Sequence, residues 1–163
     1  MKFKKIALTI TLLSVSLVGC QTMESLAKTG VYNPLDTQVT LDSDQFRSAV
    51  TNRSQADAMA HVRSEITRLY PNTRIITYNT TSGLIQTKAY SIKASDIPLH
   101  TDGTGKFTDA KATLTVIVTP ISNNKSTISV GYHYLGSKNF TLTWKQYDSN
   151  GQLEQKAANF YAK

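Results

Sequence analysis

The chain of 163 residues has one cysteine, Cys20, so no disulfide bond can form within it. Its folded part must therefore be held together by packing. Histidine is also scarce: His61, His100 and His133 show neither HxxxH nor HxH spacing, and no carboxylate stands in a motif with them. The sequence therefore predicts no metal site.

Motifs of catalysis and nucleotide binding are absent as well. Residues 103–107 resemble the end of a phosphate loop, but His100 stands where the first glycine is needed and Phe107 where Ser or Thr is needed. The chain has no G-x-S-x-G nucleophile elbow. We therefore expect no enzyme activity and no cofactor.

Basic residues exceed acidic ones, but they are scattered along the chain. The net charge of +7 includes Lys2, Lys4 and Lys5; the rest of the chain has 15 basic and 11 acidic residues, a net charge of +4. A nucleic-acid surface normally needs a clustered basic face. We therefore expect no binding of nucleic acid.

Only one long hydrophobic run is present, residues 6–18 (IALTITLLSVSLV), and it follows the basic N-terminus. As a helix this run would reach about 20 Å, short of the roughly 30 Å hydrocarbon core of a bilayer. A basic start before a short apolar core is typical of a signal peptide rather than of a stable transmembrane span.

The end of this run, Leu17, Val18, Gly19 and Cys20, resembles the bacterial lipobox at each of its four positions. The resemblance implies diacylglycerol transfer to the Cys20 thiol, cleavage after Gly19 and acylation of the new amino terminus, with palmitate among the attached chains. Small side chains admit the peptidase, and only cysteine supplies the thiol. The alternatives are an ordinary secretory signal with a chance cysteine, or a signal anchor.

Two or three acyl chains would anchor the protein firmly, because each buried methylene contributes about 0.8 kcal/mol. In diderm bacteria an Asp after the lipidated cysteine usually retains a lipoprotein in the inner membrane. Gln21 at that position favours the outer membrane, with the protein facing the periplasm. We therefore predict a signal peptide over residues 1–19, a lipidated tether over 20–36 and one domain over 37–163.

Within that domain the clearest helix covers residues 54–69. Ser54 and Asp57 form a variant of the capping box, and one helical face is apolar: Met59, Val62, Ile66 and Leu69. A short C-terminal helix is predicted over 152–161. A further helix is predicted to start near Gln45, with Phe46 and Val50 on one face, after a short strand over 37–41.

The remaining segments alternate with a period of two. They predict strands over 73–78, 84–92, 112–119, 127–135 and 140–147. The predicted fold is α+β: an antiparallel sheet of about five strands, with one long helix and a short C-terminal helix packed on one face, after a flexible N-terminal tether.

The order of a helix, a strand, the turn Ser82-Gly83-Leu84-Ile85 and a second strand covers residues 54–88. This order is similar to that of the small helix-grip domains of envelope lipoproteins such as BamC. The resemblance implies a non-enzymatic accessory role and assigns no site residue.

Two tyrosines are predicted to be exposed and to offer a binding surface. Tyr78 is out of phase with Ile75, and Tyr147 is out of phase with Trp144. We expect a membrane-anchored, non-enzymatic envelope lipoprotein that binds another envelope protein or helps to assemble a complex. The alternative is a module for a lipid, glycan or small ligand, which a cavity under Met59, Ile66 and Trp144 would favour.

Overall fold

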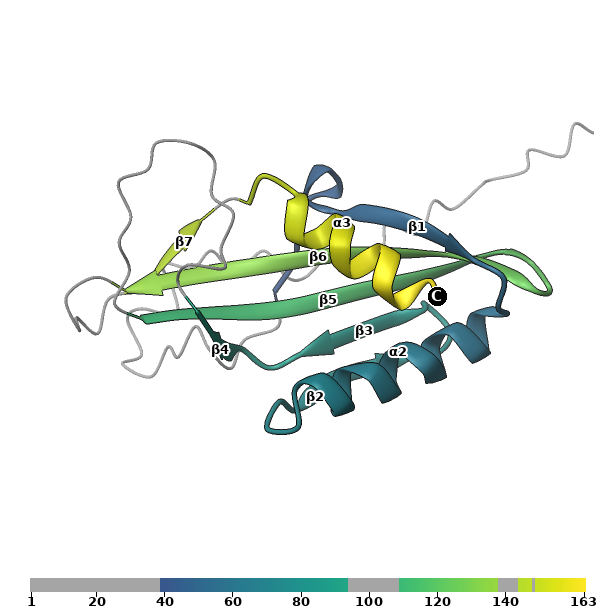
Figure 1. Ribbon diagram of the computed structural model, residues 1–163, viewed down its shortest axis with the longest axis horizontal. Coiled ribbons are helices and arrows are strands. Elements are labelled where there is room, and N and C mark those ends of the chain that lie inside the picture. The colour runs from purple at the N-terminus through teal and green to yellow at the C-terminus, as the bar shows by residue number, and fades with distance from the viewer. Residues whose placement is uncertain (1–38, 94–108, 138–143, 148) are drawn as a thin grey trace, which may run out of the picture. The chain divides into compact units, whose positions relative to one another are not determined.

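The computed structural model describes residues 39–93, 109–137, 144–147 and 149–163 (Figure 1). These residues belong to one compact unit, Asn33–Lys163. The predicted signal peptide, the predicted tether and Cys20 lie outside the described residues.

The described part of the chain forms a seven-stranded antiparallel sheet, and two α-helices pack on one of its faces (Figure 1). This is the predicted α+β class. The strands are β1 (Arg47–Thr51), β2 (Ile75–Asn79), β3 (Leu84–Thr87), β4 (Tyr90–Ile92), β5 (Asp109–Ser122), β6 (Lys125–Ser137) and β7 (Lys145–Tyr147). The helices are α2 (Gln55–Leu69) and α3 (Gln152–Tyr161), and a 3-10 turn, η1, covers Ser43–Gln45.

A long hairpin, β5 and β6, forms the centre of the sheet. Its free sides each carry two short strands placed end to end: β3 and β4 along β5, and β1 and β7 along β6. β2 then pairs with β3, so the main path of the sheet runs β1-β6-β5-β3-β2.

The hydrophobic core lies between this hairpin and the helices. Alternate residues of the two long strands face the helices and are buried: Leu114, Val116 and Val118 in β5, and Ile128, Val130, Tyr132 and Tyr134 in β6. The apolar stripe of α2 (Ala58, Met59, Val62 and Ile66) and two residues of α3 (Ala158 and Tyr161) cover them. The apolar side chains that recur every two residues in the strands and every 3.6 residues in α2 thus form one core.

Local signals fix the ends of α2 where the sequence predicts them. The Asp57 amide donates to Ser54 Oγ at 3.2 Å, and the Ser54 hydroxyl donates to Asp57 Oδ2 at 2.6 Å. At the other end the Tyr70 amide donates to Ile66 O, and Pro71 follows.

The predicted helix near Gln45 is wrong, because η1 is followed there by strand β1. A spacing of four residues between Phe46 and Val50 fits one face of a helix and equally one face of a strand. The segment forms a strand because it pairs with β6, in register from Arg47 opposite Val130 to Thr51 opposite Ser126. The strand predicted over 37–41 is also absent from its described part, residues 39–41.

Two other predicted strands differ in extent. The segment 84–92 is interrupted at Lys88 and Ala89, so it contributes β3 and β4 instead of one strand. Of the segment predicted over 140–147, residues 140–143 lie outside the described residues, and β7 covers only Lys145–Tyr147. These short strands raise the strand count from about five to seven.

The face of the sheet turned away from the helices is partly covered by the entry segment of the domain. The buried Gln86 donates from Nε2 to Val39 O at 2.7 Å and accepts from the Val39 amide at 3.3 Å. Gln86 Nε2 also donates to Thr115 Oγ1 at 2.8 Å. A Cβ atom added at Gly131 would lie within 3.2 Å of Leu41 and Phe46 side-chain atoms, so the entry segment packs closely on β6 there.

Gly83 closes the β2–β3 turn in a conformation that needs glycine. Its φ is +69°, and a Cβ atom there would collide with Val118 O. The same carbonyl accepts a hydrogen bond from Gln55 Nε2 at 2.9 Å, while the Val118 amide donates to Gly83 O at 2.9 Å. The turn, β5 and the start of α2 therefore meet at one close contact.

We expect Gly83→Ala to lower the free energy of unfolding by about 2–4 kcal/mol, because it adds both backbone strain and a collision with β5. Urea unfolding followed by circular dichroism measures this. The matched control is Ser82→Ala in the same turn, since the Ser82 side chain is exposed. Equal stability of the two variants would contradict the close contact.

Candidate functional site

The two tyrosines predicted as a binding surface lie toward opposite edges of the sheet. Tyr78 is in β2, at one end of the strand order, whereas Tyr147 is in β7, which pairs with β6. Strands β3, β5 and β6 separate them. They do not form one surface.

The exposure predicted for Tyr147 is wrong. Tyr147 lies opposite Tyr134 on the face that the helices cover, and it packs, partly buried, against the core. Trp144 belongs by alternation to the other face, where Lys111 Nζ lies 4.9 Å from the centroid of its ring. The two residues are out of phase as predicted, but their faces are the reverse of those predicted.

Tyr78 is exposed as predicted, with 37% of its surface accessible, but for a different reason. A bulge between Ile75 and Thr77 shifts the register of β2, so Tyr78 lies opposite the buried Ile85 on the helix-covered face. It is exposed because it lies beside α2 instead of beneath it. There the Arg63 guanidinium lies 5.1 Å from the centroid of the Tyr78 ring.

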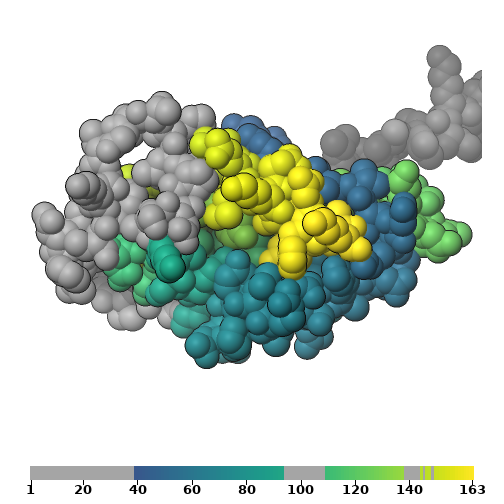
Figure 2. All heavy atoms as spheres, viewed as in Figure 1, coloured from purple at the N-terminus to yellow at the C-terminus, as the bar shows by residue number. Residues whose placement is uncertain are grey.

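A hollow of about 460 Å³ lies between the outer side of α2 and Tyr78. We call it the arginine–tyrosine hollow; its lining residues are Ala60, Arg63, Ser64, Thr67, Arg68 and Tyr78. The helical spacing of four and seven residues from Ala60 places these side chains along one stripe of α2. Figure 2 shows the outer surface of α2, in teal, open on this side of the molecule.

The two arginines of this hollow differ in their charge balance. Arg68 Nη2 lies 2.6 Å from Glu65 Oε2, and the hydrogen bond from Arg68 holds the pKa of the Glu65 carboxyl below its usual value. Within the described residues no ion pair joins Arg63 to an acid, and its contact there is the Tyr78 ring. The hollow therefore presents one guanidinium whose charge is not balanced by an ion pair.

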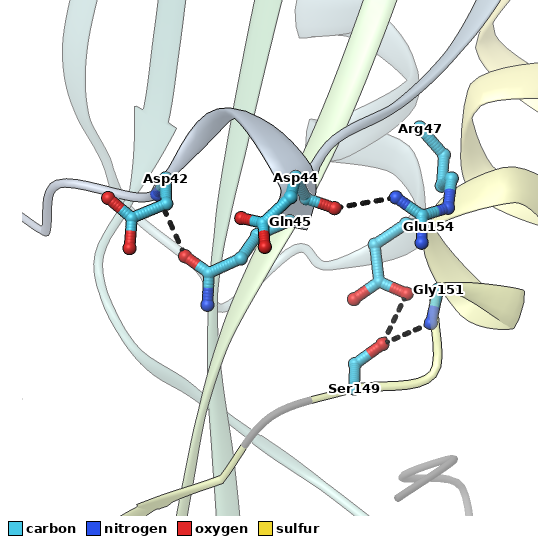
Figure 3. A pocket seen from close by; sticks show the side chains of 7 residues that line it. All are labelled: Asp42, Asp44, Gln45, Arg47, Ser149, Gly151 and Glu154. Carbon is cyan, nitrogen blue, oxygen red and sulfur yellow. Dashed lines mark hydrogen bonds between the residues drawn. The ribbon is translucent and has the colours of Figure 1, made fainter. Parts of the chain in front are cut away.

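A second hollow, of about 400 Å³, lies where η1 and β1 meet the start of α3 (Figure 3). We call it the capping hollow; it is lined by Asp42, Asp44, Gln45, Arg47, Ser149, Gly151 and Glu154. Its acidic residues and its Ser149–Glu154 pair resemble a reactive site.

The contacts in the capping hollow show a helix cap instead. The Gly151 amide donates to Ser149 Oγ at 2.8 Å, and the Ser149 hydroxyl donates to Glu154 Oε2 at 2.6 Å. Glu154 is the third residue of α3, the position from which a capping glutamate usually reaches the N-cap amide directly. Ser149 relays that bond from the Gly151 amide to the buried Glu154 carboxylate.

We expect Ser149→Ala to lower the free energy of unfolding by about 2–3 kcal/mol, because it leaves a buried carboxylate and an amide without this partner. Asn150→Ala is the matched control. Asn150 Oδ1 accepts from the exposed Gln152 amide at 3.1 Å, and its loss should cost about 1 kcal/mol or less. Thermal unfolding measures both, and equal losses would contradict a buried relay.

Four tyrosines lie in or against the core: Tyr132, Tyr134 and Tyr161 are buried, and Tyr90 is partly buried. Burial raises the pKa of each phenol above its ordinary value, and the Glu154 carboxylate raises the pKa of Tyr134 further. The ring centroids of Tyr132 and Tyr134 lie 5.6 Å apart. These phenols stay protonated in the folded protein, so they act as packing groups.

This cluster predicts loss of stability in alkali. Tyrosines of the unfolded chain ionise near pH 10, whereas those of the folded chain stay protonated, so the unfolded state binds fewer protons above that pH. The contribution of these tyrosines to stability should be constant below about pH 10 and should then fall by about 1.4 kcal/mol per pH unit for each of them. Absorbance at 295 nm should show their ionisation together with unfolding. Ionisation of all tyrosines near pH 10 without unfolding would contradict this.

The histidines do not gather into a site. His61 lies on α2 and His133 on β6, while His100 lies outside the described residues. In the described part of the chain no group of three His, Cys, Asp or Glu residues could hold a metal ion. Ser122 and Lys125, which have the S-x-x-K spacing of some serine hydrolases, are the exposed ends of the β5–β6 turn.

Among the described residues, neither helix has the length and apolar character needed to cross a membrane.

Comparison with known proteins adds little. No family model matches the chain, and no curated protein matches its sequence. Among solved structures it resembles a DUF4468 family protein from Bacteroides ovatus, with 12% sequence identity and a TM-score of 0.39 over 66% of this chain. The chain spans 64% of that protein's length, and a likeness at this level carries no information about function.

Proposed function

We propose that the chain is a lipid-anchored, non-enzymatic lipoprotein of the bacterial envelope, whose domain binds another envelope protein or helps to assemble a complex. The observation that carries the proposal is the sequence Leu17-Val18-Gly19-Cys20 at the end of a basic and then apolar N-terminus. Gln21 after the cysteine favours the outer membrane, facing the periplasm.

The described domain is consistent with a binding role more than with catalysis. The one serine–carboxylate pair of the capping hollow is explained as the cap of α3. Arginine and tyrosine line the other hollow, and both residue types are common at protein interfaces. These features support an accessory protein that acts by contact.

The alternative, a module for a lipid, glycan or small ligand under the helix, lacks the arrangement that would favour it. Met59 and Ile66 have no accessible surface and pack within the core. Trp144 lies on the opposite face of the sheet and cannot complete a cavity with them. The protein-binding role is therefore the better supported of the two.

The anchor is tested by growing cells that express the full chain with radiolabelled palmitate. We expect label in the wild-type protein and a loss of at least about tenfold in Cys20→Ala, because that variant lacks the thiol that accepts diacylglycerol. Ser25→Ala, five residues further on, is a control that should keep the label. Equal labelling of wild type and Cys20→Ala would overturn the proposal.

A further inference from the structure

Strand β2 ends the path of the sheet, and within the described residues it pairs only with β3. An edge strand presents backbone N–H and C=O groups that can pair with another chain. Two of its larger side chains, Ile76 and Tyr78, are 38% and 37% exposed. The outer side of β2 is therefore a candidate for main-chain pairing with a partner.

The opposite edge strand, β1, is less suited to that role. Helix α3 packs against β1, and Gln155 Nε2 donates to Ser48 O at 3.3 Å. Helix α2 contacts β5 and β6 and crosses in front of β2 in Figure 1, but among the described residues no strand pairs with the outer edge of β2. As far as the described residues go, β2 is the more open of the two edges.

The arginine–tyrosine hollow lies directly beside this edge, because Tyr78 belongs to both. The Arg63 side chain is exposed at its surface and lies over the Tyr78 ring, without a partner acid among the described residues. Arg68, in the same hollow, already holds Glu65 at 2.6 Å. A carboxylate brought along β2 would therefore meet Arg63, the one arginine there that can form a new ion pair.

We propose that β2 binds an extended acidic segment of a partner protein as an added strand, and that an Asp or Glu side chain of that segment pairs with Arg63 in the arginine–tyrosine hollow. Main-chain hydrogen bonds to β2 would supply much of the affinity, and the carboxylate would supply the specificity. This inference rests on the proposed function and deepens it, since it names the surface and the chemistry of the partner.

An anionic membrane surface is a poorer fit to the same residues. Electrostatic binding to lipid needs several basic residues that act together. On α2, the two positive charges of Arg63 and Arg68 are equalled in number by the two negative charges of Asp57 and Glu65. These four residues therefore add no net charge. Arg63 beside β2 and the exposed Arg74 just before it form no ion pair with a described acid, and these two charges suit a carboxylate better than a lipid surface, which needs several.

The test uses the full chain, expressed with ¹⁵N label and purified from membranes in detergent. The probe is a blocked seven-residue peptide of alternating threonine and valine with one central glutamate. We expect its addition to shift the amide resonances of Ile75–Asn79, with affinity about tenfold above that of the peptide with glutamine in place of glutamate. A peptide N-methylated at every amide, which has no N–H group to donate to β2 from either edge, should not bind.

Arg63→Gln should remove the preference for glutamate, whereas Arg68→Gln, the matched change at the arginine already paired to Glu65, should keep it. Both side chains are exposed, so neither change should unfold the domain. The inference is overturned if β2 does not respond to millimolar peptide, or if both variants keep the same preference. It is also overturned if phosphatidylglycerol vesicles, and not the peptide, bind in an Arg63-dependent way.

These outcomes are independent of the lipid anchor. Palmitate labelling that depends on Cys20, together with no peptide binding, would overturn only the β2 inference. Peptide binding that depends on Arg63, together with no labelling, would leave the β2 inference standing and overturn the anchor.

Discussion

Burial of the helix-facing side of the β5–β6 hairpin is the interaction on which the rest of the domain depends. Leu114, Val116 and Val118 lie opposite Tyr132, Val130 and Ile128, and all six are almost completely inaccessible. Each such side chain contributes about 1.5–3 kcal/mol when buried. Without a disulfide, these contacts and the cover given by α2 and α3 must offset the entropy of ordering the chain.

On the other face of the sheet, polar contacts of Gln86 join apolar packing in holding the entry segment. Gln86 satisfies its amide with Val39 and Thr115, so a buried polar group becomes a fixed attachment for the entry segment of the domain. Both the amide and the carbonyl of Val39 are bonded to the one side chain of Gln86. The segment that follows the predicted tether is thereby held on the face away from the helices.

The two hollows show how similar-looking residues can have different roles. Ser149 and Glu154 look reactive as a pair, yet their bonds complete the first turn of α3. Arg63 and Tyr78 come from segments that no motif links, and only packing brings them together. The roles differ because Ser149 and Glu154 already use their hydrogen bonds within the cap of α3, whereas Arg63 has no ion pair with a described acid.

The sequence alone determined what depends on local chemistry: the lipobox prediction at Cys20, the two helices, the cap of α2, and the period-two strands of an α+β sheet. Tertiary structure decided what depends on pairing between distant segments. The spacing of Phe46 and Val50 fits a helix and a strand alike, and pairing with β6 chose the strand. A bulge in β2 turned Tyr78 toward α2, and the register of β7 against β6 turned Tyr147 inward and Trp144 outward. Alternation predicts which residues of a strand share a face. Only pairing with a partner strand decides which of the two faces is buried.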